Sequence, residues 1–360
     1  MKKIIVLACK THLQVISSLC IIDEYLSRGE EIEVGFFSLS DRFSPDFLNK
    51  LRQLELFEFV VQLPIFNSDK YLTNYSSSLS CKDLLAYYLT KSASKPKIFR
   101  SIRSFSIDNY FLKPRHKKFI EKASDLFIYD PFDISPSITS LTRKECLIHQ
   151  IDEGIGSYLQ RTTEKLKPDY IHLFAPSLST HSKEYLSKLL EIPKISLNNK
   201  RLICWLTSLY PSALDNQIPN KVFCDQTYGE WKDPIPGSFR TNLIHRLFRN
   251  EKSLFYKPHP ASGENYLRKH IIPAVEGRIY SSDVPFEIEI LLSKTKPQAI
   301  YTINSSSATH WRLMFADDFG IKLTIFESSF RKLAGSTHQS GISDFFDKFV
   351  KHYSQQVDML

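Results

Sequence analysis

The first half of the chain alternates short apolar runs with stretches of mixed polarity. The apolar runs have the length of buried strands, and we expect strands at residues 3–9, 31–37, 60–63, 125–129, 146–150 and 170–174. Between the first two, residues 11–26 carry apolar side chains at helical spacing, namely Leu13, Ile16, Leu19, Cys20 and Ile22. Strands that alternate with helices are typical of βαβ units and a parallel sheet.

A second set of elements follows a seam at residues 176–200, which contains Pro176, Pro193 and an Asn-Asn-Lys turn. Here we expect strands at 201–207, 254–256, 278–281, 299–302 and 322–325, with helices at 262–275, 285–293 and 308–315. Residues 68–118 are rich in Ser, Lys and aromatic residues, and we interpret them as helical. The pattern predicts an α/β protein of two Rossmann-like, doubly wound domains, residues 1–195 and 196–360, facing each other across a cleft. In such sheets ligands bind at the carboxyl ends of the strands.

Composition agrees with two folded domains. The chain has 360 residues, 42% of them hydrophobic and 24% charged, which excludes a largely disordered protein. The apolar run at the N-terminus is far shorter than the roughly 20 residues that span a bilayer, and no signal-peptide pattern follows it. The six cysteines are scattered without metal-ligand spacing. We therefore expect a cytoplasmic protein without structural disulfides.

The net charge of +8 is concentrated in two stretches that also carry apolar residues. Residues 91–118 hold nine Lys or Arg and one acid, Asp108, and residues 241–252 form the second stretch. A solvated helix face explains both. Contact with an anionic membrane surface or a phosphorylated glycolipid is the functional alternative, and nucleic acid fits less well.

The first motif that can carry chemistry follows the predicted strand at 146–150. It reads Asp152-Glu153-Gly154, which places two carboxylates on a tight turn at the end of a strand. A carboxylate there can accept the proton of an attacking hydroxyl. An acidic turn that caps the next helix is the structural alternative.

The second motif is Lys257-Pro258-His259-Pro260, at the end of the predicted strand 254–256. The prolines fix the backbone on both sides of the histidine. A protonated His259 can neutralise a departing phosphate and donate a proton to it, and Lys257 adds positive charge.

The third motif runs from Thr302 through Ser305, Ser306 and Ser307 into a predicted helix. Hydroxyls and free N–H groups at a helix N-terminus bind anions, although a Ser-rich N-cap can also be only structural. Between the second and third motifs, the segment 285–289 offers a carboxylate for ribose hydroxyls. No Asp-x-Asp pair and no Gly-rich phosphate loop occurs, so we expect no metal and no cofactor. A nucleoside monophosphate leaving group, with less charge than a diphosphate, suits such a site.

In this order, the three motifs resemble those of bacterial lipooligosaccharide and capsule sialyltransferases. The segment from Cys9 to Gln14 is similar to that family's first strand–helix junction. The resemblance implies a GT-B fold, CMP-sialic acid as donor and inversion at the anomeric carbon. It also implies an acceptor-side N-terminal domain, with Thr11 and Gln14 facing the acceptor, and a donor-binding C-terminal domain.

The resemblance also implies roles for single residues. Asp152 is the candidate base, supported by Glu153, and His259 is the general acid or phosphate partner. Ser305 and Ser306 hold the phosphate, joined by Ser307, Thr302, Lys257 and Pro260 in donor binding, and Glu287 binds the ribose. Some members of the family carry the base between the second domain's first strand and the histidine motif. In this chain that loop is residues 207–215, so Asp215 is a rival base.

We therefore expect a metal-independent sialyltransferase that acts on a terminal galactose-type residue of a bacterial surface glycan, either a glycolipid or an oligosaccharide. The histidine motif is also similar to that of Kdo and polyol-phosphate transferases, which likewise release CMP. A glucosyltransferase of the same fold is a further alternative, and a basic glycan- or nucleic-acid-binding protein is the non-enzymatic one. Peripheral contact with the inner membrane and a homodimer are both compatible with the sequence.

Overall fold

The computed structural model describes residues 2–39, 43–63, 112–128, 138, 141–159, 168–226, 237–259, 262, 264, 267–327 and 340–360. The chain divides into two compact units. Unit 1 comprises Met1–Glu153, Arg161–Leu173 and Glu184–Ile192, and unit 2 comprises Gly154–Gln160, Phe174–Lys183 and Pro193–Leu360. The chain therefore first passes from unit 1 to unit 2 at the Glu153–Gly154 peptide bond.

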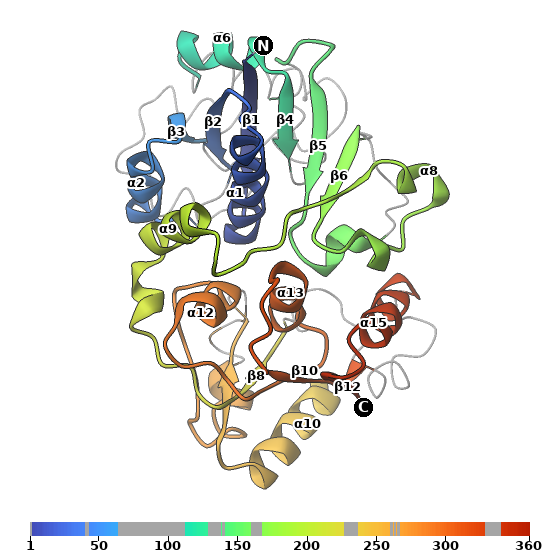
Figure 1. The fold of residues 1–360 in the computed structure, drawn as a ribbon. Helices are drawn as coiled ribbons and strands as arrows, with labels where there is room; N and C mark the ends of the chain where they lie inside the picture. The colour runs from blue at the N-terminus through green and yellow to red at the C-terminus, as the bar shows by residue number, and fades with distance from the viewer. Residues whose placement is uncertain are drawn as a thin grey trace, which may run out of the picture. The chain divides into compact units, whose positions relative to one another are not determined.

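Unit 1 is built on a seven-stranded sheet in the order β3-β2-β1-β4-β5-β6-β7, and every strand pair is parallel (Figure 1). The strands are β1 (Lys3–Cys9), β2 (Ile32–Ser38), β3 (Phe57–Gln62), β4 (Asp125–Ile128), β5 (Leu147–Ile151), β6 (Tyr170–Leu173) and β7 (Leu189–Glu191). The order reverses beside β1, as in a Rossmann-type doubly wound sheet. Consecutive β1 residues Ile5–Cys9 are almost fully buried, as expected for a parallel strand covered on both faces.

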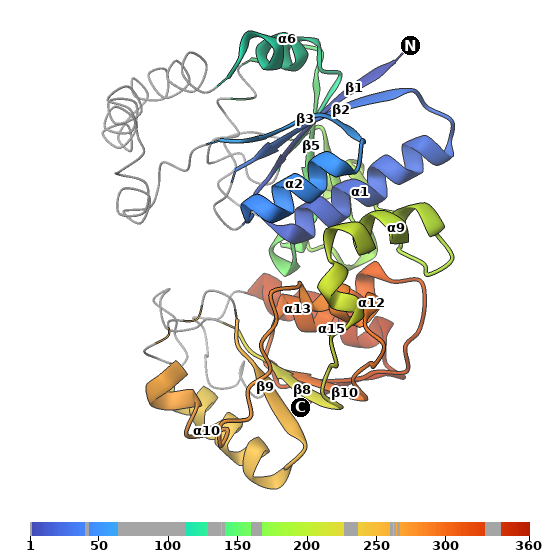
Figure 2. The same cartoon turned by 90° about the vertical axis from the view of Figure 1, so that its left-hand side faces the viewer.

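The longer helices among the described residues of unit 1 are α1 (His12–Ser27), α2 (Pro45–Gln53) and α6 (Pro114–Lys122). Both views place α1 and α2 together on one side of the sheet, and α6 beside the amino end of β1 (Figures 1 and 2). Thr11 caps α1, and Gln14 completes the capping box by bonding back to the Thr11 amide. Ser44 caps α2 by accepting the Phe47 amide at its hydroxyl.

Unit 2 contains a five-stranded parallel sheet in the order β12-β11-β10-β8-β9. The strands are β8 (Lys221–Cys224), β9 (Leu254–Lys257), β10 (Ala299–Thr302), β11 (Lys322–Ile325) and β12 (Val357–Met359). The order reverses between β8 and β10. In a doubly wound sheet, the carboxyl ends of the strands at such a reversal are the expected ligand-binding position.

Helices lie on both faces of the unit 2 sheet. The views show α12 (Phe286–Leu292), α13 (Ser306–Met314) and α15 (Ser340–His352) on one face, and α10 (Gly237–Asn250) on the other (Figures 1 and 2). Ile244 and Phe248 of α10 pack on Phe223 and Tyr256 of the sheet. The remaining described segments are α9 (Lys200–Leu209), the short helix α8 (Lys183–Leu186), the 3-10 turns η2 (Ile155–Tyr158), η3 (Pro176–Leu178) and η4 (Pro211–Leu214), and the π-helical turn η5 (Leu267–Ile271). No helix in these described segments is long and apolar enough to cross a membrane.

The predicted α/β class with parallel sheets is confirmed, and the first strand is predicted to the residue. The strand predicted at 201–207 is wrong, because this segment forms α9. Its apolar residues Leu202, Leu206 and Leu209 recur at helical spacing and are buried together. Residues 278–281 form only a single bridge, from Ile279 to Tyr256, and the prediction missed β7, β8 and β12. The helical prediction for residues 68–118 lies mostly outside the described residues.

A buried chain of ionisable groups crosses three strands of unit 1. Asp125 Oδ1 is 2.9 Å from His149 Nε2, and His149 Nδ1 is 2.9 Å from His172 Nε2. Phe127 stacks on the His149 ring with a centroid distance of 4.4 Å. Burial, reinforced by the neighbouring His149, lowers the pKa of His172 to about 3. Burial alone would raise the pKa of Asp125, but hydrogen bonds from His149 and Ser124 hold it below its usual value.

We predict that His172 makes the protein less stable in weak acid. Its pKa in the folded state lies below the unfolded value of about 6.5, so the unfolded chain binds the extra proton. The free energy of unfolding should fall as pH drops from about 6.5 towards the folded pKa, with a contribution from this residue of up to roughly 1.4 kcal/mol per pH unit. The measurement is the free energy of unfolding in urea, for wild type and for His172→Gln, at a series of pH values between about 6.5 and the folded pKa. An unchanged pH slope in the variant would contradict the assignment.

Candidate functional site

The carboxyl edge of the unit 2 sheet carries two of the three motifs. These are the histidine motif, residues 257–260, and the serine motif, residues 302–307. Cys224 at the end of β8 is in register with Lys257 of β9 on one side and with Thr302 of β10 on the other. His259 follows β9 by two residues, and Ser305 follows β10 by three. Both motifs therefore leave the sheet at the same edge, on strands two spacings, or roughly 10 Å, apart.

The histidine motif begins with a cation that is already paired. Lys257 Nζ lies 3.4 Å from Glu289 Oε2, with the rings of Tyr280 and Phe286 at 5.1 and 5.4 Å. The other Glu289 oxygen accepts hydrogen bonds from Tyr280 at 2.5 Å and from Asn216 at 2.8 Å. Because this network binds its charge, Lys257 acts chiefly as a support for the end of β9. His259 is half-buried just beyond it, and its carbonyl accepts the Ser262 amide at 2.9 Å, whereas Pro260 lies outside the described residues.

The Ser-rich motif forms the N-terminus of α13. Thr302 is buried, and its hydroxyl accepts the Ser305 amide at 2.8 Å, which fixes the turn out of β10. Ser305 occupies the N-cap position in an extended conformation without a side-chain capping bond. The first N–H groups of a helix have no acceptor within the helix, so this turn is suited to an anion.

Gly154, the glycine of the acidic motif Asp152-Glu153-Gly154, packs directly on this serine turn. Gly154 belongs to unit 2 and has φ of +132°, a conformation that favours glycine. A Cβ at Gly154 would lie 3.1 Å from Ser306 Oγ, and the Ile155 amide donates to the same oxygen at 3.4 Å. The first and third motifs therefore meet at Ser306. The two carboxylates precede this contact directly in the sequence.

Two carboxylates of α12 lie under the same edge and have different surroundings. Glu287 is 5% exposed, and its burial raises the pKa, although Ser307 donates to it and His310 and Lys257 lie near it. Glu289 is fully buried in the network around Lys257. Glu287 is therefore the carboxylate that contacts the serine motif, and Glu289 is held in the network around Lys257. The ribose role of Glu287 stays a prediction.

The carboxylates of the acidic motif belong to unit 1. Asp152 directly follows β5 and is fully buried, whereas Glu153 is half-buried. The Asp152 carbonyl accepts the hydroxyl of Ser17, a buried residue of α1, at 3.2 Å. Ser17 thus fixes the backbone at the start of the motif, a contact that no sequence pattern indicated. The pairing of Asp152 or Glu153 with His259 stays a prediction.

The predicted acceptor-side residues both serve the start of α1. Thr11 is the N-cap, and the Oε1 of Gln14 accepts the amides of Lys10 at 2.5 Å and Thr11 at 3.2 Å. The Gln14 Nε2 atom is buried and has no hydrogen-bond partner within the described residues. Gln150 of β5 lies two residues before Asp152, and both atoms of its side-chain amide are also buried without a hydrogen-bond partner among the described residues. Sequence inspection missed Gln150, because an amide inside an apolar strand gives no local signal.

The case for Asp215 as rival base rests on a strand that does not exist. Residues 201–207 are part of α9, and Asp215 is an exposed residue that caps η4, ahead of β8. The first strand of unit 2 is β8, and the acid that follows it is Asp225. That carboxylate is buried and bonded by Arg240 and Tyr256, with Arg240 Nε at 3.0 Å. The role predicted for Asp215 therefore loses its structural premise.

We predict that Gly154→Ala destabilises the protein more than Gly277→Ala. Both glycines have positive φ, but a Cβ at Gly277 meets nothing within 4 Å, so the second variant measures backbone strain alone. Strain should cost roughly 1–3 kcal/mol at Gly277 and at least as much at Gly154, whose φ of +132° and ψ of −171° lie in a region essentially restricted to glycine; crowding against Ser306 adds to the loss only at Gly154. The measurement is the free energy of unfolding in denaturant. The double variant Gly154→Ala, Ser306→Gly should recover the part of the loss that comes from crowding, and equal losses in the two single variants would contradict the contact.

No protein-family model and no curated protein matches the chain. Among solved structures, it is similar to a putative UDP-N-acetylglucosamine 2-epimerase from Listeria monocytogenes, with 10% identity, 92% of this chain and 81% of that one covered, and a TM-score of 0.47. A sialyltransferase from Photobacterium damsela has 13% identity, covers 99% and 81%, and has a TM-score of 0.40. An E. coli heptosyltransferase has 10% identity, covers 99% and 99%, and has a TM-score of 0.37. Likenesses this distant assign no activity to the chain.

Proposed function

We propose that the protein is a metal-independent, inverting sialyltransferase. It takes sialic acid from CMP-sialic acid and transfers it to a terminal galactose-type residue of a bacterial lipooligosaccharide or capsule. The observation that carries the proposal is the meeting of the motifs in unit 2. The histidine and serine motifs share one sheet edge, and the glycine of the acidic motif packs on Ser306.

The leaving group is a phosphate monoester, and unit 2 supplies groups that suit it. The N-terminus of α13 carries a partial positive charge, and Ser305 and Ser306 add hydroxyl donors. His259 protonates a phosphate oxygen of the departing CMP. Lys257 is paired with Glu289, so His259, the two serine hydroxyls and the helix N-terminus balance the phosphate charge. Ribose hydroxyls bind to Glu287, beside Ser307.

The acidic motif supplies the base. The acceptor hydroxyl gives its proton to Asp152, supported by Glu153, and its oxygen forms the new bond to the anomeric carbon. The bond from that carbon to the phosphate oxygen breaks, and CMP carries away the electron pair. Attack opposite to the leaving group inverts the centre. Holding donor and acceptor in line can contribute roughly 7–11 kcal/mol to the acceleration.

The basic segments favour work at the cytoplasmic face of the inner membrane, where glycolipid acceptors are available. The second basic stretch lies on α10, which leaves His245, Arg246 and Arg249 exposed. The α6 helix carries the described end of the first stretch. Such surfaces gain affinity for anionic lipids by electrostatic attraction.

The decisive experiment is release of CMP from CMP-sialic acid with a galactoside acceptor in the presence of EDTA. We expect turnover that added Mg²⁺ or Mn²⁺ does not increase, and a product of inverted configuration by NMR. CMP and CDP should raise the melting temperature, whereas UDP should not. Absence of turnover with this donor, together with turnover of a CMP-linked Kdo or polyol donor, would move the assignment to the other CMP-releasing transferases. A strict requirement for metal would reject the mechanism.

Variants of the proposed acid and base should lower kcat more than they raise KM. His259→Ala and Asp152→Asn should each lower kcat about 10²–10⁴-fold, the range for general acid–base groups. His352→Ala is the matched control, because it removes an exposed histidine of the same unit to which no role is assigned, and it should leave kcat unchanged. A loss below tenfold in His259→Ala would exclude its role at the leaving group.

A further inference from the structure

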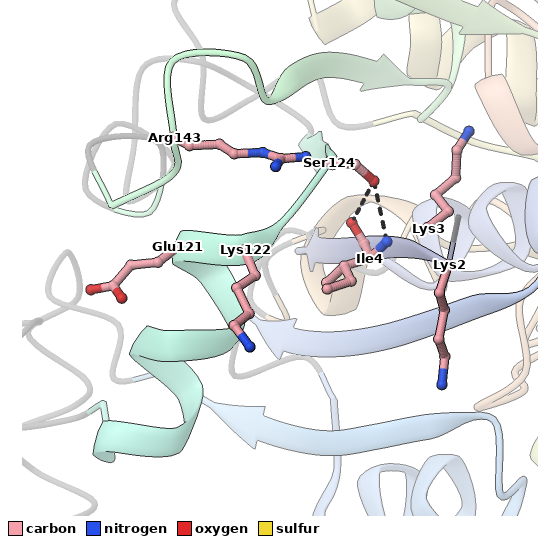
Figure 3. A pocket seen from close by; sticks show the side chains of 7 residues that line it. All are labelled: Lys2, Lys3, Ile4, Glu121, Lys122, Ser124 and Arg143. Atoms are coloured by element: carbon pink, nitrogen blue, oxygen red, sulfur yellow. Dashed lines mark hydrogen bonds between the residues drawn. The ribbon is translucent and has the colours of Figure 1, made fainter.

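A pocket of about 450 Å³ opens at the amino end of the unit 1 sheet, away from the carboxyl ends where the motifs lie. It is lined by Lys2, Lys3, Ile4, Glu121, Lys122, Ser124 and Arg143 (Figure 3). Four of these seven residues are cations and one is an acid. No part of the proposed transfer reaction uses them.

The floor of the pocket is fixed by the meeting of β1 and β4. Ser124 Oγ donates to the Ile4 carbonyl at 3.0 Å and accepts the Ile4 amide at 3.2 Å, as the dashed lines in Figure 3 show. Arg143 Nε donates to the Ala123 carbonyl at 3.1 Å, which orients the guanidinium towards Ser124. The guanidinium is therefore held in place before any ligand arrives.

The four cations that line the pocket differ in whether an acidic side chain lies near them. Lys3 extends away from Lys2 and Lys122 in Figure 3 and lies 3.8 Å from Asp125 and 3.9 Å from Glu30. Lys2 is half-exposed and pairs with Glu33 at 2.7 Å. Lys122 and Arg143 are exposed and have no acidic partner among the described residues. Glu121 points away from the other side chains in Figure 3, so Lys122 and Arg143 leave the pocket with excess positive charge.

The helix α6 lies beside the pocket and carries further positive charge on its exposed face. His116 and Ile120 are the buried residues of α6, and its exposed residues include Arg115, Lys118 and Lys122, with Lys113 at the N-cap. Cations placed around a pocket, and not only in it, favour a ligand that belongs to an extended anionic surface over a small free ion.

We propose that this pocket binds the phosphate of an anionic lipid headgroup, with Arg143 as its ligand, and that Lys122 and the rest of α6 lie against the same lipid surface. The planar guanidinium of Arg143 can give two parallel hydrogen bonds to phosphate oxygens, and Lys122 adds a point charge. The inference deepens the proposed membrane contact by assigning it a site. It does not depend on the identity of the transferred sugar.

The test is sedimentation of the full chain with phosphatidylcholine vesicles that contain none or about 30% phosphatidylglycerol. We expect binding to the anionic vesicles only, and weaker binding at high salt. The double variant Lys122→Ala, Arg143→Ala should bind roughly thirtyfold more weakly, since each cation near the surface contributes about 1 kcal/mol. The control, Lys200→Ala with Lys351→Ala, removes the same charge from exposed positions of unit 2 and should bind like wild type.

Two results would overturn the proposal. Equal vesicle binding by the pocket variant and the control variant would show that total charge, not this pocket, decides the affinity. Stabilisation of wild type by inorganic phosphate, without vesicle binding, would identify a free-anion site instead. Because sedimentation needs no turnover, and the pocket variant should still act on a soluble galactoside, failure here is distinguishable from failure of the proposed transfer reaction.

Discussion

The parallel register of three strands in unit 2 is the constraint on which the candidate site depends. Cys224 is paired with Lys257 on one side and Thr302 on the other, so the chain segments after β9 and β10 leave the sheet at the same level. A slip of one residue would move each strand's side chains to the opposite face of the sheet, which the apolar core around Phe223 and Tyr256 opposes. Core packing therefore fixes the spacing between His259 and the serine turn.

A second constraint lies at the boundary between the units. The chain leaves unit 1 at Glu153, and the next residue, Gly154, already packs on Ser306 of unit 2. A Cβ at Gly154 would crowd the Ser306 side chain, and L side chains rarely adopt this positive φ, so the position favours glycine. The short Asp-Glu-Gly motif thus combines two tasks, since its carboxylates end a strand of one unit while its glycine contacts the proposed phosphate turn of the other.

The two ends of the parallel sheets have different chemistry. Acids, a histidine and hydroxyls follow the carboxyl ends, where a doubly wound fold binds its ligands. Cations gather at the amino end of the unit 1 sheet, between Lys2 and Arg143. At the carboxyl ends of β8 and β9, buried ionisable groups are paired with residues of the neighbouring helices, as Lys257 is with Glu289 and Asp225 is with Arg240. Such pairing avoids the cost of an isolated buried charge and holds the strand ends that carry the motifs.

The sequence by itself determined the α/β class, most strands of unit 1 and the three motifs, because hydrophobic periodicity and turn residues act locally. It misassigned residues 201–207, where only burial of Leu202, Leu206 and Leu209 on one helix face distinguishes α9 from a strand. It also gave no indication of β8, the strand between the two motif-bearing ones. Tertiary structure alone decided that Glu289 and not Glu287 binds Lys257, that Ser17 holds Asp152, and that Gly154 meets Ser306. These contacts join residues 32 to 152 positions apart in the chain, and such pairings depend on how elements pack, which no local pattern encodes.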